Sequence, residues 1–436
     1  MSRSGPNRIS IRMYHVGFGD CFLLTFHYSS VDRHLLIDFG STRQTKTYMK
    51  AVAKDIQSRC GGKLDALLAT HRHKDHLSGF QTDPDPTKIS SGGIIADLKP
   101  DLVSMTWTED PKLDVDALGP EKSQDQLSFV YSLKQMQSLA EIAGQAAESA
   151  RKRRSYRLAN ELGNLAEINI ANKSALANLL TMADTESTEF LHYGSKTALN
   201  AMFRGVRFHV LGPPTVEQSL GVKSQVSRDV DEYWHLANYW RFMHASYQHG
   251  GGSESPFPKY VERRLPDHAR WLIDRTTDPT HTDLLRISRV MDRAINNTSV
   301  ILLIELWGTK LLFPGDAQIE SWDYVLNGPD GAKNRKLLTD IYVYKVGHHA
   351  SLNGTPKSLW NLFQYRKDRS PSTPMYALLS SRIDIHGHRD NGTEVPRSKL
   401  IDALESGSEL IASRWDIPKT EKITDLEFSD LEINFV

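Results

Sequence analysis

Three histidines and one aspartate stand within six residues of each other, directly after a short apolar run. His71, His73, Asp75 and His76 follow the strand-like segment Leu64–Ala69. Residues two apart in an extended chain face the same side, so the first two histidines are expected to converge. If a helix follows, the aspartate and the third histidine lie in its first turn, where the helix dipole favours a carboxylate that can face a second ion. Imidazole and carboxylate suit zinc, iron or manganese, so this spacing predicts a metal site. The alternative is a polar loop that is rich in histidine by chance.

Two later strand-like runs also end in side chains that suit a cation. Asp316 follows residues 310–314, and its carboxylate could bridge two metals, since a charged residue at that place needs a partner. His348 and His349 follow the apolar run 341–346. A turn residue at Asp316 and a pair of polar cap residues at the two histidines are the alternatives.

Together these motifs resemble the metallo-β-lactamase-fold hydrolases, whose signature His-x-His-x-Asp-His follows a strand. The resemblance covers residues 7–85 and about 296–415, and it is closest to the subgroup that contains the soluble domain of ComEC, the DNA-uptake protein. The further segments that carry it occur in the same order along the chain: Tyr14–Cys21, Leu36–Gly40, Asn296–Val300, Leu311–Ala317 and Lys345–Ser351.

The resemblance implies an α/β fold, the αββα sandwich of that superfamily, interrupted by two mainly helical insertions. Long segments without structure of their own are improbable inside a compact domain. The expected division is a first half of the core at 1–85, a helical insertion at 86–200, a core strand at 201–216, a second helical insertion or lid at 217–295, and the second half of the core at 296–436.

The resemblance also implies two divalent metal ions, with zinc expected before manganese or magnesium. One of the pair His348 and His349 would complete the second metal's shell, and we expect His348 to do so. The expected metal ligands are therefore His71, His73, Asp75, His76, Asp316 and His348.

Further roles follow from the same resemblance. Asp75 and His388 are the expected catalytic residues, although Arg389 stands where a proline usually follows such a Gly-His segment. A histidine there could protonate a leaving oxygen or hold a phosphate, and the alternative is an exposed loop residue. Asp20 and Asp38 are expected to orient metal ligands or brace loops. The side chains expected to contact the substrate are Asn297, His349, Ser351 and His386.

One position departs from the superfamily pattern. Asn296 and Asn297 stand where many members carry another histidine, the third ligand of the first metal. An amide oxygen is a poorer zinc ligand than imidazole. The first site could therefore be weak, hold manganese or magnesium, fill only with substrate, or recruit a histidine such as His192. His209, inside a strand-like run, is expected to be structural.

Composition sets the outer limits of the function. The chain has 436 residues, 39% hydrophobic and 24% charged, and its 53 basic and 53 acidic residues give no overall field that would hold a polyanion. A basic cluster at 151–154 with Arg157 could touch phosphates or form a solvated helix face. Two cysteines exclude a disulfide framework. The polar first ten residues lack the core of a secretory signal and no membrane span is evident, so we expect the cytoplasm.

The expected reaction is metal-assisted hydrolysis, in which an activated water attacks an electrophilic phosphorus or carbonyl. Analogy with the ComEC subgroup favours a phosphodiesterase or nuclease that acts on DNA, RNA or a nucleotide. A small-molecule hydrolase, such as a phosphorylcholine esterase or lactonase, is the alternative that zero net charge favours. A third possibility is an effector or regulatory module that docks a protein partner through the helical insertions.

Overall fold

A computed structural model shows that the chain divides into two compact units. The first contains Met1–Asp110, Ala171–Pro214 and Asn296–Val436, and the second contains Pro111–Ile170 and Thr215–Ile295. The structure describes residues 5–112, 148, 151–152, 172–183, 187–215, 217–219, 295–383, 385, 394–413 and 425–435. Almost all of these belong to the first unit, which carries the predicted metal motifs.

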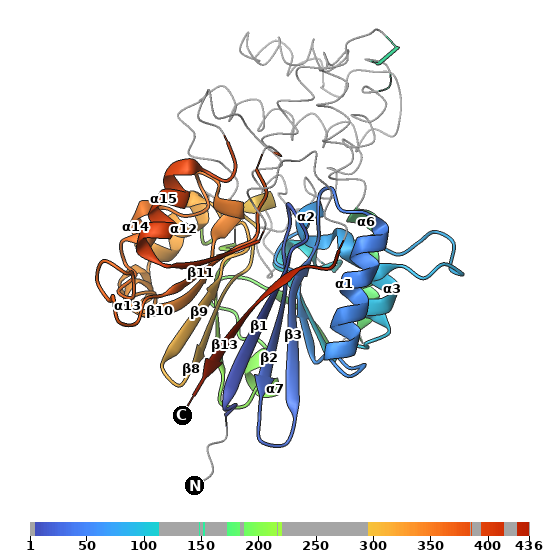
Figure 1. The fold of residues 1–436 in the computed structure, drawn as a ribbon, viewed down its shortest axis with the longest axis horizontal. Coiled ribbons are helices and arrows are strands. Elements are labelled where there is room, and N and C mark those ends of the chain that lie inside the picture. The colour runs from blue at the N-terminus through green and yellow to red at the C-terminus, as the bar shows by residue number, and fades with distance from the viewer. Residues whose placement is uncertain are drawn as a thin grey trace, which may run out of the picture. The chain divides into compact units, whose positions relative to one another are not determined.

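Thirteen strands are described, and all of them lie in the first unit (Figure 1). They are β1 (Arg8–Tyr14), β2 (Cys21–His27), β3 (Asp32–Phe39), β4 (Ala66–Leu68), β5 (Leu102–Thr106), β6 (Thr188–Leu191), β7 (Arg207–Gly212), β8 (Ile301–Leu306), β9 (Thr309–Phe313), β10 (Ile341–Lys345), β11 (Tyr376–Leu379), β12 (Glu409–Ala412) and β13 (Phe428–Asn434).

The strands form two mixed sheets of similar design. The seven-stranded sheet has the order β13-β1-β2-β3-β4-β5-β6, and the six-stranded sheet has the order β12-β11-β10-β9-β8-β7. In each sheet an antiparallel part continues into a parallel part. Short connections join β1 to β2, β2 to β3 and β8 to β9, whereas β13 pairs with β1 and β7 with β8 across long stretches of sequence. Parallel pairing needs long crossover connections, and helices supply several of them.

The helices begin and end as follows: α1 (Lys46–Arg59), α2 (Lys74–Leu77), α3 (Ser91–Ala96), α6 (Asn172–Met182), α7 (Leu199–Met202), α12 (Ile319–Asn327), α13 (Gly331–Leu337), α14 (Lys357–Trp360) and α15 (Ser398–Gly407). Short 3-10 turns occupy η1 (Ser78–Phe80), η2 (Trp107–Glu109) and η5 (Gly347–Ala350). Helix α1 begins after Thr45, whose side chain accepts a hydrogen bond from the backbone of Tyr48, as a helix cap does.

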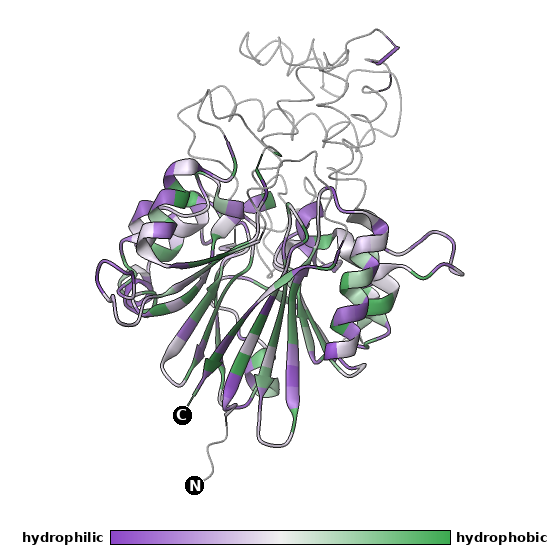
Figure 2. Ribbon diagram, viewed as in Figure 1, coloured by the Kyte–Doolittle hydropathy of each residue, from purple (hydrophilic) through white to green (hydrophobic). Residues whose placement is uncertain are grey.

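The two sheets pack face to face because side chains alternate between the two sides of each strand. In β3, Leu35 and Ile37 join the core between the sheets, whereas Leu36 joins a core shared with α1, α3 and α6. In β9, Phe313 lies in the central core and Leu312 in a core shared with α12, α14 and α15. The result is an α/β sandwich of four layers, with apolar strands inside and polar helix faces outside (Figure 2).

Several strands of this sandwich end at the same edge. The loops that follow β4, β9, β10 and β11 carry His71, Asp316, His348 and Ser380 respectively. In open sheets with parallel strands, ligands bind outside the carboxyl ends of the strands. This edge is therefore the place where the predicted metal motifs meet.

The range 86–200 that we predicted for the first insertion is too long at both ends. Helix α3 and strand β5 precede residue 111, and α6 and β6 follow residue 171, so these elements belong to the sandwich. Strands β5 and β6 pair in parallel with each other, and β5 also pairs with β4, which extends the first sheet. The second unit begins at Pro111 and resumes at Thr215; the helices expected in it, and the lid, lie outside the described residues.

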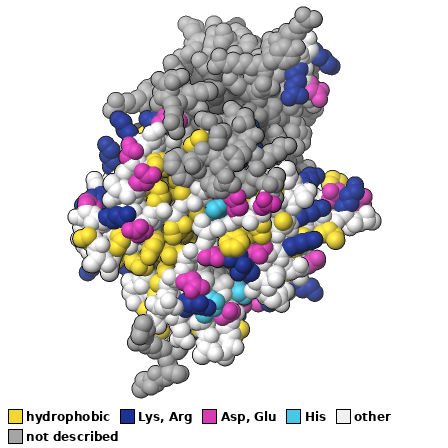
Figure 3. Space-filling model, in the orientation of Figure 1, with side chains coloured by type: hydrophobic (Ala, Val, Ile, Leu, Met, Phe, Trp, Pro, Cys, Tyr) yellow, Lys and Arg dark blue, Asp and Glu magenta, His cyan; other side chains and the backbone are white. Residues whose placement is uncertain are grey.

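The described surface carries both signs of charge. In the view of Figure 3, lysine and arginine side chains are interspersed with aspartate and glutamate over the described part of that face. None of the described helices combines the length and apolar character that crossing a membrane would require.

Candidate metal centre

The loop after β4 brings the first two histidines together. Nε2 of His71 and Nδ1 of His73 lie 3.1 Å apart, as the spacing predicts. Between them Arg72 points the other way, and its Nε donates to Oε1 of the buried Glu109 at 2.9 Å. This ion pair, which sequence analysis did not find, helps to hold the loop while its neighbours face the site.

Asp75 and His76 lie in the first turn of α2, as expected. The helix packs directly against Gly40, the residue that follows β3. A Cβ atom at position 40 would lie 2.4 Å from the carbonyl carbon of Asp75 and 2.4 Å from the amide nitrogen of His76. Glycine is therefore required at position 40 for this close approach. A glycine at position 40 thus lets two predicted ligands, Asp75 and His76, lie close to the end of β3.

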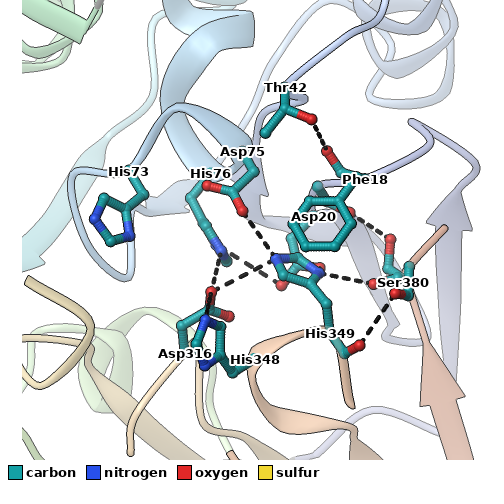
Figure 4. A network of polar contacts seen from close by, with 12 residues as sticks. Phe18, Asp20, Thr42, His73, Asp75, His76, Asp316, His348, His349 and Ser380 are labelled. Atoms are coloured by element: carbon teal, nitrogen blue, oxygen red, sulfur yellow. Dashed lines mark hydrogen bonds and ion pairs between the residues drawn. The ribbon is translucent and has the colours of Figure 1, made fainter. Parts of the chain in front are cut away.

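Asp316 is the shared centre of the cluster. Its Oδ2 lies 3.2 Å from Nε2 of His76, 3.5 Å from Nε2 of His349, and 3.9 Å from Nε2 of both His71 and His348. The carboxylate is almost completely buried. One oxygen thus faces four imidazoles that arrive from both sheets. Figure 4 shows three of them, His76, His348 and His349, around Asp316.

His348 and His349 occupy an unusual turn after β10. His348 has φ 46° and ψ 49°, His349 has φ 51° and ψ 32°, and Ala350 has φ 63°. The left-handed region costs a residue with a side chain about 1–2 kcal/mol. Three such residues in succession persist only where surrounding contacts hold them, and such outliers often mark functional sites.

Contacts on both sides of His349 place it beside Asp75. Its Nε2 lies 3.1 Å from Oδ2 of Asp75, and its Nδ1 lies 2.8 Å from the carbonyl oxygen of Ser380. A proton on Nδ1 that is donated to this carbonyl leaves the lone pair of Nε2 for a metal. The geometry favours His349 at the place where we expected His348; the assignment stays a prediction.

Asp38 holds His76 from behind, in agreement with the role expected for it. Its Oδ2 lies 2.7 Å from Nδ1 of His76 and accepts the hydroxyl of Thr70 at 2.7 Å, and its Oδ1 accepts the backbone N–H of Thr70 at 2.7 Å. Through these contacts Asp38 braces His76 itself and Thr70, the residue next to His71. Such carboxylate–histidine pairs fix the ring orientation of metal ligands.

A buried lysine, which we did not assign a role from sequence, lies behind the cluster. Nζ of Lys345 forms an ion pair with Asp20 and lies 3.6 Å from Oδ1 of Asp316. Burial alone would lower the pKa of Lys345, but Asp20 and then Asp316 outweigh it and raise the pKa above its usual value. The signal was present in the sequence, since a charge at the end of an apolar strand needs a partner.

The donor set fits a divalent metal ion. One oxygen or nitrogen from each of Asp75, His76, Asp316 and His349 lies within 4.8 Å of the others. Ligands about 2.1 Å from a tetrahedral zinc are about 3.4 Å apart, close to the distances around Asp316. Within the described residues, Asp316 Oδ1 and Asn296 Oδ1 are buried without a hydrogen-bond partner, as atoms that can ligate a cation would be.

A second group, Asp20, Asp38 and His76, is also close enough to hold an ion. However, Lys345 already neutralises Asp20, and Thr70 and His76 occupy the oxygens of Asp38. We therefore infer that these three residues support the main cluster and do not hold an ion of their own.

The charges of the cluster are set by mutual contacts. Burial alone would raise the pKa of Asp75 and of Asp316, but contacts with His349 and His76 outweigh it, so both carboxyl pKa values are lowered. Burial alone would lower the pKa of His76 and of His349, but Asp316 outweighs it and raises both. Burial lowers the pKa of His348 to about 4.

These shifts predict that metal binding strengthens as the pH rises. Because the pKa values of His76 and His349 are raised in the metal-free protein, each ring holds its proton to a higher pH than a free histidine does, and ligation requires both rings to be neutral. Each proton released should add up to about tenfold in apparent affinity per pH unit. Calorimetry between pH 6 and 8, in buffers of different ionisation enthalpy, measures this release; an affinity that does not change with pH would contradict it.

The other predicted site residues differ in what they contact. Both polar atoms of the Asn297 side chain contact α12: Nδ2 donates to Glu320 at 3.1 Å, and Oδ1 accepts from the Ser321 hydroxyl at 3.4 Å. This side chain therefore braces that helix. Ser351 contacts His348 through its hydroxyl at 2.7 Å. His209 pairs with Glu305 at 3.1 Å, in agreement with a structural role. His386 and His388 lie outside the described residues.

His192, considered as a replacement ligand, contacts its own loop. Its Nδ1 lies 3.1 Å from the carbonyl oxygen of Tyr193, and its backbone N–H donates to Ser195 at 3.1 Å. Over the described residues, neither of the two possible metal-binding groups includes it.

None of the protein-family models matches the chain, and neither does any curated protein.

Proposed function

We propose that this protein is a metal-dependent hydrolase of the metallo-β-lactamase fold, with a phosphodiester as its substrate. The observation that carries the proposal is the convergence of Asp75, His76, Asp316 and His349 within 4.8 Å. These residues come from three separate segments and both sheets, so local sequence composition does not account for their meeting. The topology of the four-layer sandwich supports the same superfamily.

The side chains divide the work of binding between them. His71 and His73 would hold one ion, Asp75, His76 and His349 a second, and Asp316 lies between the two groups. Two divalent ions, zinc before manganese or magnesium, would supply a nucleophile at neutral pH and stabilise negative charge on the substrate. Asp38 and the Ser380 carbonyl keep the ring nitrogens of two ligands in a fixed orientation.

The choice of a phosphodiester rests on the resemblance to the ComEC subgroup, an argument by analogy. Zero net charge and the mixed charges of the described surface favour the second candidate, a small-molecule hydrolase. Of the basic cluster at 151–154 and Arg157, the structure describes Arg151 and Lys152, and both are exposed.

Turnover of model substrates tests the proposal. With manganese or zinc, the purified protein should cleave bis(p-nitrophenyl) phosphate or an oligonucleotide, and His73→Ala or Asp75→Ala should lower kcat/KM at least about 100-fold, as loss of a group that stabilises the transition state does. His209→Ala is the matched control, because this histidine pairs with Glu305 instead of the cluster, and we expect it to stay within about twofold.

Three results would reject or redirect the proposal. Wild-type turnover in Asp75→Ala would reject metal-assisted hydrolysis at this site. Cleavage of a lactone or a phosphorylcholine ester, with no cleavage of either diester, would favour the small-molecule candidate. A stoichiometric partner that co-purifies, with full biological function in metal-site variants, would favour an effector.

A further inference from the structure

The resemblance to the metallo-β-lactamase superfamily implies that the first site lacks one ligand, because Asn296 stands where many members of that superfamily carry a histidine. Two imidazoles, His71 and His73, meet at 3.1 Å, and Asp316 Oδ2 lies 3.9 Å from His71. These three residues leave one position of a tetrahedral shell to be filled. Another described side chain would have to fill this fourth position.

His348 lies beside Asp316 and Asn296. Its Nε2 is 3.9 Å from Oδ2 of Asp316, the same distance as that of His71, and 3.3 Å from Nδ2 of Asn296. Its imidazole thus lies against the very side chain that replaces the usual histidine. An imidazole that arrives from β10 can therefore stand in for one that would have come from position 296.

His349 faces a different direction from its neighbour. The two ring centroids are 6.4 Å apart, and His349 points toward Asp75 and the Ser380 carbonyl, whereas His348 lies beside Asp316 (Figure 4). The consecutive left-handed residues of the turn give adjacent imidazoles these separate directions. This provides a reason for a backbone conformation that is otherwise unfavourable.

Ser351 prepares His348 for ligation. Its hydroxyl lies 2.7 Å from Nδ1 of His348. A proton on Nδ1 that is donated to this oxygen leaves Nε2 unprotonated, as ligating histidines require. That nitrogen lies 3.3 Å from Nδ2 of Asn296, whose N–H a metal ion would displace. The His348 side chain is 24% exposed, so it is the most accessible of the imidazoles around Asp316.

We propose that the histidine pair is divided between the two metal sites: His348 completes the first site with His71, His73 and Asp316, and His349 completes the second. This inference rests on the proposed function, because it requires that the cluster bind two ions. It replaces the expectation that a single member of the pair is a ligand.

Metal titration of variants tests the division. The full-length, metal-free protein is titrated with Co²⁺, and calorimetry and visible absorption give the number of ions and their affinities. The variant His348→Asn removes the imidazole, and asparagine tolerates the left-handed backbone. His349→Asn is its matched control. Each change is made in the wild-type protein, in His73→Ala, which disables the first site, and in Asp75→Ala, which disables the second.

We expect His348→Asn to weaken the remaining site at least about tenfold in the Asp75→Ala protein and less than about twofold in the His73→Ala protein. His349→Asn should show the opposite pattern. The inference is overturned if His348→Asn acts on the second site, or if it changes neither. Should this variant fail to fold, His348→Gly takes its place, since glycine suits the same backbone.

The same titration separates this inference from the function on which it rests. Two ions in the wild-type protein, with the coupling reversed, would overturn only the division of the pair. A wild-type protein that binds no Co²⁺ would overturn the proposed hydrolase and this inference together.

Discussion

Asp316→Asn is expected to lower metal-dependent hydrolysis by at least about a thousandfold, the effect of losing several kcal/mol of transition-state stabilisation. The substitution keeps the shape of the side chain and removes its charge. Asp316 is the residue whose single oxygen lies within 3.9 Å of four imidazole nitrogens, so both proposed sites would lose their common ligand. Measurement of kcat/KM together with bound metal by elemental analysis checks the prediction.

The control for this variant is Asp323→Asn on the same segment. Asp323 lies on the exposed side of α12, where it accepts a hydrogen bond from Asn327 at 2.8 Å. A change there should leave activity within about twofold. If Asp316→Asn retained both ions and a tenth of the wild-type activity, the shared role of this carboxylate would be wrong.

Lys345→Met is expected to destabilise the metal-free protein by about 3–5 kcal/mol, the usual effect of removing one partner of a buried ion pair. The ammonium group is almost completely shielded from solvent, where it pairs with Asp20 and also donates to the Gly315 carbonyl at 3.3 Å. Methionine fills a similar volume but leaves Asp20 buried without its countercharge. Urea denaturation in the presence of a chelator measures the loss.

Two further variants separate charge from packing. Lys367 pairs with Glu409 at the surface, with the side chains 35% and 49% exposed, and Lys367→Met should cost no more than about 1 kcal/mol. Adding Asp20→Asn to Lys345→Met should recover part of the stability, because the uncompensated charge is then gone. A loss below about 1 kcal/mol in Lys345→Met alone would contradict an ion pair at this place.

Local sequence pattern was sufficient for the elements that carry the predicted ligands. The apolar runs at 310–314 and 341–346 correspond closely to β9 and β10, and α2 begins where the His-x-His-x-Asp-His spacing predicts. Short apolar runs that end in polar residues are strong signals. They place Asp316 and the histidine pair at strand ends, and parallel pairing then brings those ends to one edge.

Pattern was insufficient where the outcome depends on contacts between distant segments. Strand β5 falls within 86–200, the range that we assigned to an insertion, because no local pattern shows that it pairs with β4. The partner of Lys345 is Asp20, more than 300 positions earlier in the sequence. Likewise, the directions of the His348 and His349 side chains depend on left-handed backbone angles, which the residue types at these positions do not predict.

The origin of the ligands has a thermodynamic consequence for the whole sandwich. His71, His73, Asp75 and His76 extend from the seven-stranded sheet, whereas Asp316 and the histidine pair extend from the six-stranded one. A cation bound by both sets would tie the layers together across their apolar interface. At a free concentration of 100 times its Kd, such an ion adds about 2.7 kcal/mol to the free energy of unfolding. Metal supply would thus govern how long the chain survives unfolding and proteolysis, in addition to whether it can react.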